Sequence, residues 1–449
     1  MKKKVVLFGF ILIGVLSLIL TYKLKQNSLN KNKPFKEEKL SIMIKELGAT
    51  DYAKSSSKDI PKGNYTMNTE KSFCENNGKI EGYDSTTGTV SFAFIGTDKC
   101  FLYFDYKATY AYETILMDNG AENGKASSTN EAINYISSKG DPDFAIYPET
   151  NEGLYKTEDY QGSSYYFRGA ADNNWVIFGD SGASSPIYWR IIRINGDNSI
   201  RLIYSFGSEG SACSSLRDKD NFNVIGCNTS NRFLTAFSSS KNTYGLKYTD
   251  NEQHGNTNNN AILDALYGFY EYYNLDVYRD YFADTIYIND RTAYNTDGNE
   301  IDSWVPENNS YYFGSYERLN RSSPKLNFVG SNADIFSTRS DIANIDYPIG
   351  LLTAEEANMA GAMANQTSCT NCGNYLNTIN GAFWTMSPMQ TNPDYIACIS
   401  TDASTNGGFT YLDFCDPTSE YSVRPVISLK ANTIFRGSGT YNNPYSVVG

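Results

Sequence analysis

Histidine is almost absent from this sequence, whose 449 residues include a single one, His254. Hydrolases of the Ser-His-Asp or Cys-His type need a histidine base, so such a site would have to use His254. A metal site built from several histidines is excluded. His254 lies in the polar stretch Glu252–Asn256, which contains no nucleophile-elbow motif. We therefore expect the protein not to be an enzyme.

Basic residues are also scarce. The chain has 38 Lys and Arg against 50 Asp and Glu, which gives a formal net charge of −12. Nucleic acids bind through their phosphates to basic surfaces, and this composition provides none. The sequence thus predicts no nucleic-acid partner.

A hydrophobic run without charge occupies residues 5–22, directly after three lysines. At about 1.5 Å per residue, a helix of this length just crosses a hydrocarbon core of about 30 Å. We predict a cytoplasmic tail at residues 1–4 and a transmembrane anchor at residues 5–22, by which the protein is held in the membrane.

Two alternatives to an anchor remain open. A cleaved signal peptide also follows basic residues, but no small-x-small cleavage signature follows the run, and Lys23 and Lys25 come next. A pilin-like leader is the third interpretation, because Gly9-Phe10 resembles its cleavage site. Such leaders usually carry Glu five residues later, where this chain has Gly14.

The eight cysteines all follow the hydrophobic run and fall into near neighbours. An even number in loop-rich sequence favours disulfides formed in an oxidising compartment. The candidate pairs are Cys74 with Cys100, Cys213 with Cys227, Cys369 with Cys372, and Cys398 with Cys415. Eight cysteines allow about 105 connectivities, so the pairing does not follow from sequence. Cys369-Thr-Asn-Cys372 also has the spacing of a redox or metal half-site.

The cysteines decide the predicted orientation. Lysines are more numerous just after the run than before it, which opposes an external C-terminus under the positive-inside rule. Long exported domains tolerate some basic residues, so we give the cysteines more weight. We expect a single-pass protein of the cell membrane with its C-terminal domain outside the cell.

Composition and hydrophobic periodicity divide the rest of the chain. We expect a polar stalk over residues 23–64 with a short helix from Glu38 to Leu47, and a small disulfide-stapled β domain over residues 65–111. A polar connector over residues 112–164 carries a short helical stretch at Asn130–Ile136. The larger domain covers residues 165–449.

The larger domain combines strands with two helices. Tyr188–Ile194 and Ile200–Tyr204 alternate around an Asn-Gly-Asp-Asn turn, which predicts a hairpin. Apolar residues at helical spacing predict a helix over Asn260–Tyr273. A second helix is expected from Thr353 to Ala360, because Thr353 and Glu356 form a capping box. Ile396–Ser400 and Tyr411–Cys415 are predicted to be paired strands. The pattern indicates an α+β fold.

Three blocks of this domain carry a resemblance to a known family. Tyr188–Tyr204, Phe383–Pro388 and Val423–Lys430 resemble anchored or secreted surface proteins of Gram-positive bacteria. Their ectodomain is similar to the C-type-lectin-like fold shared with formylglycine-generating enzymes. The resemblance implies short antiparallel strands flanked by two helices, and binding outside the cell rather than catalysis. The copper-binding cysteine pair of the enzymes is not expected here, because Cys398 and Cys415 are better explained by a cross-strand disulfide.

A calcium site is a weaker prediction. Oxygen-bearing side chains alternate around Gly298 in a pattern that suits calcium, although an Asp-Gly turn explains the pattern equally well. The candidate ligands are Asn295, Asp297, Asn299 and Asp302. No other cofactor is expected.

The aromatic, Asn-rich region between Trp384 and Tyr421 is the predicted binding surface. Rigid aromatic rings supply contact area at small entropic cost, while Asn and Ser adapt their hydrogen bonds. The candidate residues are Met389, Tyr395, Phe409, Tyr411 and Tyr421. They could equally be strand residues that face the core, and Trp384 is expected to be buried. Arg190, Arg193 and Arg201 on the hairpin are expected to be solvated or paired.

Together these observations predict a membrane-anchored extracellular binding or adhesion protein. Its partner would be a glycan, a cell-wall polymer or a surface protein bound without a covalent link. The alternative is a pilin-like or structural component of an envelope assembly.

Overall fold

The computed structural model describes residues 40–448 except 47–48, 58, 63–64, 86, 95–97, 108, 123, 181–185, 206–225, 228–232, 302–308, 328–329, 365–372, 377–380 and 403–408. It divides into two compact units, unit 1 up to Ala108 and unit 2 from Thr109 onward.

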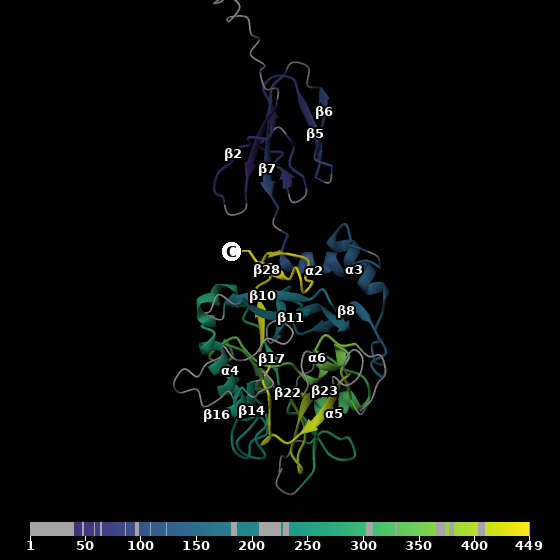
Figure 1. The fold of residues 1–449 in the computed structure, drawn as a ribbon, viewed down its shortest axis with the longest axis vertical. Coiled ribbons are helices and arrows are strands. Elements are labelled where there is room, and N and C mark those ends of the chain that lie inside the picture. The colour runs from purple at the N-terminus through teal and green to yellow at the C-terminus, as the bar shows by residue number, and fades with distance from the viewer. Residues whose placement is uncertain are drawn as a thin grey trace, which may run out of the picture. The chain divides into compact units, whose positions relative to one another are not determined.

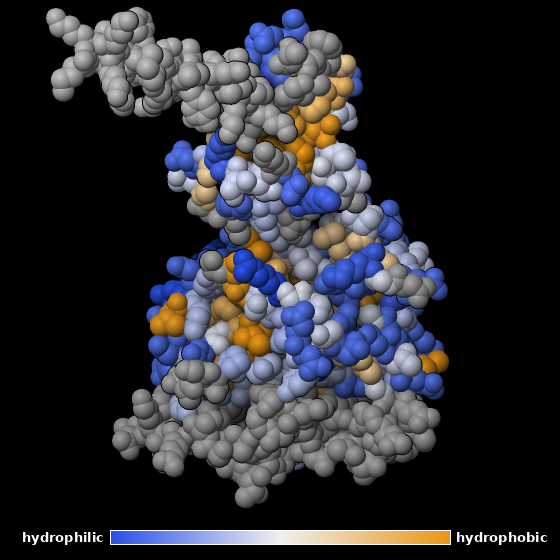
Figure 2. All heavy atoms as spheres, turned by 45° about the horizontal axis from the view of Figure 1, so that its top comes forward, coloured by the Kyte–Doolittle hydropathy of each residue, from blue (hydrophilic) through white to orange (hydrophobic). Residues whose placement is uncertain are grey.

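Unit 1 is built from strands (Figure 1, purple to blue). Its main sheet contains β1 (Leu40–Lys45), β2 (Ala53–Lys54), β3 (Tyr65–Met67), β4 (Phe73–Cys74) and β7 (Cys100–Tyr106), and a separate hairpin pairs β5 (Lys79–Asp84) with β6 (Thr89–Phe94). The core is small: Ile42, Leu102 and Phe104 are buried, and the apolar residues around them are only partly covered. Hydrophobic side chains also reach the surface of this unit (Figure 2).

Unit 2 contains a large sheet that we call sheet I. Its strands are β8 (Asn151–Asp159), β9 (Gly162–Gly169), β10 (Trp175–Asp180), β11 (Pro186–Ile194), β12 (Ile200–Tyr204), β26 (Val426–Leu429), β27 (Phe435–Arg436) and β28 (Tyr445–Val447). The β11–β12 hairpin is present as predicted, and its turn places Asn198 at a φ of 65°, a conformation that Asn adopts readily. β26 then pairs with β12 from far along the chain.

A second sheet of unit 2, sheet II, contains the C-terminal aromatic region. Its strands are β13 (Gly226–Cys227), β14 (Phe233–Ala236), β18 (Ala293–Tyr294), β19 (Tyr312–Phe313), β21 (Met363–Ala364), β22 (Gly381–Gln390), β23 (Tyr395–Asp402), β24 (Phe409–Cys415) and β25 (Glu420–Ser422). Short ladders join β15 (Lys247–Tyr248) to β16 (Asn258–Asn259) and β17 (Tyr287–Ile288) to β20 (Ile335–Phe336). The predicted pairing of the strands around Cys398 and Cys415 is confirmed.

Unit 2 also contains helices. They are α2 (Ala111–Asn119), α3 (Thr129–Ser138), α4 (Ala261–Tyr272), α5 (Gly314–Asn320) and α6 (Ala354–Met359), with 3₁₀ helices at Leu275–Tyr281 and Asn332–Asp334. The capping box of α6 is confirmed: Thr353 Oγ1 accepts a hydrogen bond from the Glu356 amide, and the Thr353 amide donates to the Glu356 carboxylate.

The three blocks quoted above meet at one side chain, that of Arg424. Its Nε donates to the carbonyl of Tyr204, which ends the first block, at 2.9 Å. Its guanidinium lies 4.7 Å from the centre of the Phe383 ring, which begins the second block. Trp189 and Trp384 are both fully buried, as expected for Trp384. The blocks therefore form the centre of the core.

The predicted fold class is wrong. Strands take up 38% of the structure and helices 16%, so the chain is predominantly β rather than an α+β domain of the C-type-lectin-like kind with two helices. Several short segments form strands although they were predicted to be polar loops. Tyr and Thr in such segments fit pleated, half-buried surfaces. Within the stretch Glu38–Leu47 that was expected to be a helix, residues 40–45 form β1, whose partner β7 supplies a parallel ladder.

The predicted stalk contains β1 and β2, and the predicted connector contains most of α2 together with α3 and β8. Within the described ranges, no helix is both long enough and apolar enough to cross a membrane, and the predicted anchor at residues 5–22 lies outside those ranges.

Candidate functional site

The five predicted binding residues do not share one surface. Met389 is buried, and Tyr421 packs edge-on against Trp384 with ring centres 4.9 Å apart. Tyr411 lies opposite Ser400 in the β23–β24 ladder. Ser400 and Tyr395 are both on β23, and residues separated by an odd number of positions along a strand project from opposite faces. Tyr411, which is paired with Ser400, therefore projects from the face of sheet II opposite to Tyr395. The side chain of Phe409 is not among those described.

Tyr395 instead belongs to a line of side chains that crosses four strands. Tyr294 on β18 is directly opposite Tyr312 on β19, and Tyr312 is directly opposite Gln390 on β22. Gln390 in turn pairs with Tyr395 on β23. Residues directly opposite one another project from the same face of a sheet. Register alone therefore places the three tyrosines in one line.

Two further rings complete this surface. Tyr316 on α5 stacks on Tyr312 with centres 4.2 Å apart and contacts Phe414 edge-on at 5.8 Å. Phe414 contacts Tyr395 edge-on at 5.7 Å. Each of the rings keeps part of its surface exposed. We call Tyr294, Tyr312, Tyr316, Tyr395 and Phe414 the aromatic row.

Two hydroxyl groups of the row, those of Tyr294 and Tyr316, stay protonated well above neutral pH. Burial, followed by the carboxylates of Asp290 and Glu300, raises the pKa of Tyr294. Burial also raises the pKa of Tyr316. Tyr294 and Tyr316 therefore present neutral hydroxyl groups that can donate and accept hydrogen bonds.

Ion pairs hold α5 against the start of β18. Arg318 on α5 donates to Asp290 at 2.8 Å and to Glu355 at 2.6 Å, and both carboxylates are almost completely buried. Figure 1 shows α5 beside β22. Because Asp290 precedes Tyr294 by four residues and Arg318 follows Tyr316 by two, these contacts fix the two rings relative to each other.

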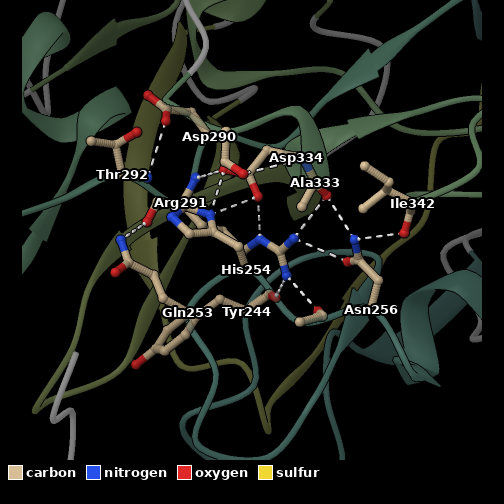
Figure 3. Close-up of polar contacts among 12 residues, drawn as sticks. Tyr244, Gln253, His254, Asn256, Asp290, Arg291, Thr292, Ala333, Asp334 and Ile342 are labelled. Carbon is tan, nitrogen blue, oxygen red and sulfur yellow. Dashed lines mark hydrogen bonds and ion pairs between the residues drawn. The ribbon is translucent and has the colours of Figure 1, made fainter. Parts of the chain in front are cut away.

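The segment that enters β18 is fixed by a second, fully buried ion pair (Figure 3). Arg291 Nε donates to Asp334 at 2.6 Å. The other guanidinium nitrogens of Arg291 donate to the carbonyls of Lys247, Gly255 and Ala333 and to Asn256. Three loops are thus attached to one side chain immediately before Ala293 and Tyr294.

The single histidine belongs to this network. His254 Nδ1 lies 3.1 Å from both oxygens of Asp334. Within the described ranges, the His254 ring contacts the carboxylate of Asp334 and no hydroxyl or thiol nucleophile. A histidine and a carboxylate alone can position a proton but cannot provide the attacking atom of a triad. His254 thus contributes one contact to the network around Arg291 and Asp334.

Another cluster of buried charges joins sheet I to α6. Glu356 lies 2.6 Å from Arg201 Nε and 3.0 Å from Arg193 Nε, and Arg193 also contacts Asp159 at 2.6 Å. Although burial alone would raise it, Arg201 and Arg193 hold the pKa of Glu356 below its usual value. Arg193 and Arg201 were expected to be either solvated or paired. Both are paired, and both are buried.

The predicted calcium loop forms a turn. Asn295 Oδ1 accepts hydrogen bonds from the amides of Asp297 and Asn299 at 3.0 and 2.9 Å, so this oxygen stabilises the turn. Asp302 lies outside the described residues, and the described part of the chain contains no group of three acidic, His or Cys side chains placed to hold a metal. Calcium binding stays a prediction.

Two of the predicted disulfides are present. Cys74 is bonded to Cys100 and Cys398 to Cys415. Cys213, Cys369 and Cys372 lie outside the described residues, as does the side chain of Cys227.

Sequence reasoning found Tyr395 but missed the other members of the aromatic row. Tyr312 and Tyr316 were visible as aromatic residues four positions apart, the spacing at which helical neighbours meet. Their approach to Tyr395 depends on the pairing of β19 with β22, which joins segments far apart in the chain. Local periodicity carries no signal for that contact.

Comparison with known proteins gives no relative for this chain: no protein family, curated protein or solved structure matches it.

Proposed function

We propose that this protein is a membrane-anchored extracellular binding protein that recognises a glycan through the aromatic row. The observation that carries the proposal is the register of sheet II, which aligns Tyr294, Tyr312 and Tyr395 across neighbouring strands. Pyranose rings have apolar faces of C–H bonds that pack on aromatic rings, while their hydroxyl groups bond to the polar rim of a site.

The site is built for binding without large rearrangement. The rings lie on strands and on a helix whose positions are fixed by buried ion pairs. A surface that is already ordered loses little conformational entropy when it binds a ligand. Disulfides support an extracellular setting, and the hydrophobic run at residues 5–22 supports anchoring. Catalysis is not part of the proposal.

Affinity measurements with the purified full-length chain and immobilised polysaccharides test this function. Tyr316→Ala and Tyr395→Ala should each weaken retention, whereas Tyr441→Ala should not. Tyr441 is a suitable control because it is an exposed ring that contacts Trp175 and Tyr188 in another aromatic cluster. Equal retention of all variants would contradict the proposal.

A structural role in an envelope assembly is the second candidate, and one feature of unit 1 favours it. A groove of about 600 Å³ lies between β3 and β4 on one side and β5 on the other, lined by Tyr65, Phe73 and Tyr83 among others. In the described part of unit 1, β3 and β4 pair only with β7, and β5 pairs only with β6. Open strand edges can accept a further strand. Concentration-dependent assembly of the purified chain would favour this candidate.

A further inference from the structure

The charges around the aromatic row indicate which class of glycan it accepts. Asp297 and Glu300 are exposed on the turn that follows Tyr294. Glu317 is adjacent to Tyr316 in sequence. Acidic groups thus lie beside two of the five rings.

In the described part of the chain, the arginines at the end of α5 are themselves paired with carboxylates. Arg318 is bound by Asp290 and Glu355, and its side chain is 15% exposed. Arg321 is exposed but pairs with Glu317 at 2.9 Å. The chain as a whole carries a formal charge of −12. An anionic polymer would bring its charges close to these carboxylates, and like charges at an interface oppose association.

The length of the row sets a second requirement. Tyr294, Tyr312, Gln390 and Tyr395 occupy four adjacent strands. Neighbouring strands are about 4.8 Å apart, so the line spans about 14 Å. This is longer than one sugar ring and fits a short linear oligosaccharide.

We propose that the aromatic row selects a linear glycan segment that carries no anionic groups and is several sugar units long. The inference rests on the proposed function and adds the class of ligand. Phosphodiester-linked wall polymers and polyuronates are excluded by the carboxylates beside the rings. Single sugars bind weakly because they cover only part of the row.

Titration calorimetry on the purified full-length chain tests both requirements. The neutral probes are oligomers of glucose and of N-acetylglucosamine, from the monosaccharide to the hexasaccharide. The anionic probes are poly(glycerol phosphate) and polygalacturonate. Affinity should rise with the length of at least one neutral series until the row is covered and then level off, and the anionic polymers should bind at least tenfold more weakly.

The variant Glu300→Gln gives a second readout. Because this carboxylate is exposed, does not form the stacking surface and is not among the candidate calcium ligands, the variant should keep the affinity of the native chain for the neutral oligomers. Its affinity for poly(glycerol phosphate) should rise by about threefold, within the range of exposed charge pairs. Addition of EDTA to a parallel titration tests the predicted calcium loop.

The outcomes separate the inference from the function on which it rests. Tighter binding of an anionic polymer, if lost in Tyr316→Ala, would overturn the ligand class and leave glycan binding intact. Affinity that does not depend on oligomer length would overturn the requirement for a linear segment. The absence of binding to every probe would overturn both the inference and the proposed function.

Discussion

Arg318 donates a hydrogen bond of 2.8 Å to Asp290 and joins α5 to the segment that enters β18. The same guanidinium binds Glu355, whose side chain has no exposed surface. The contact positions Tyr316 against the rest of the aromatic row, so it links the stability of unit 2 to the geometry of the site.

Replacement of Arg318 by Ala should strongly destabilise unit 2. Asp290 and Glu355 would be left buried without their cation, a change that costs about 3–5 kcal/mol in comparable cases. Arg321→Ala, near the end of the same helix, removes a pair whose arginine is 69% exposed, and should cost no more than about 0.5 kcal/mol. Urea unfolding of both variants measures the difference, and similar losses would contradict the assigned role of Arg318.

Glu356→Gln should reduce stability at neutral pH and lose its effect in acid. Burial opposes ionisation, but Arg201 and Arg193 outweigh it and lower the pKa of Glu356 in the folded state. The ionised carboxylate of Glu356 therefore stabilises the folded protein at pH values above the pKa that a glutamate has in the unfolded chain, about 4.3. That contribution disappears as the pH falls through the lower, folded pKa.

Unfolding free energies at a series of pH values measure this dependence. The difference between native chain and Glu356→Gln should be constant above about pH 5 and shrink below it. Glu158→Gln is a suitable control, because Glu158 is 54% exposed and lies 3.7 Å from Lys156. A difference for Glu356→Gln that grows in acid would contradict the pairing.

Arg291 and His254 share Asp334 but should differ greatly in importance. Arg291→Ala removes a buried cation that is attached to three loops, with an expected cost of about 3–5 kcal/mol. The His254 side chain is 32% exposed, so His254→Ala should cost about 1 kcal/mol. Thermal unfolding compares the two variants. A larger loss for His254→Ala would show that the histidine, not the arginine, holds the loops.

The disulfides should stabilise the two units separately. Closing loops of 26 and 17 residues contributes about 3 kcal/mol each in the chain-entropy account. Calorimetry should resolve two transitions, and Cys74→Ala/Cys100→Ala should lower the one that belongs to unit 1, whose core is small. Cys398→Ala/Cys415→Ala should lower the other. A single transition affected equally by both changes would contradict independent units.

Local patterns were sufficient to predict several elements of unit 2. The β11–β12 hairpin, α4 and the capping box of α6 depend on residues within a few positions of one another, and all are present. The same approach failed at residues 40–45, where β1 forms because β7 lies beside it. A short segment with both helical and strand character takes its structure from its partner.

The candidate site was predicted only in part for the same reason. Tyr395 was identified from composition, but its neighbours in the row come from β18, β19 and α5, which reach it through pairing across the chain. The buried arginines were also misjudged. A charged residue on a strand is expected to face solvent when no acidic partner lies near it in the sequence. The partner of Arg193 is Glu356, which lies far along the chain.

The affinity of the aromatic row for a neutral oligosaccharide tests the central claim most directly. Titration calorimetry would compare the native chain with Tyr316→Ala, Tyr316→Phe and the control Tyr441→Ala, with melting temperatures measured in parallel. We predict that Tyr316→Ala weakens binding about tenfold, or about 1.4 kcal/mol, while Tyr316→Phe and Tyr441→Ala bind like the native chain. Binding that is unchanged in Tyr316→Ala, or lost equally in Tyr441→Ala, would contradict the account.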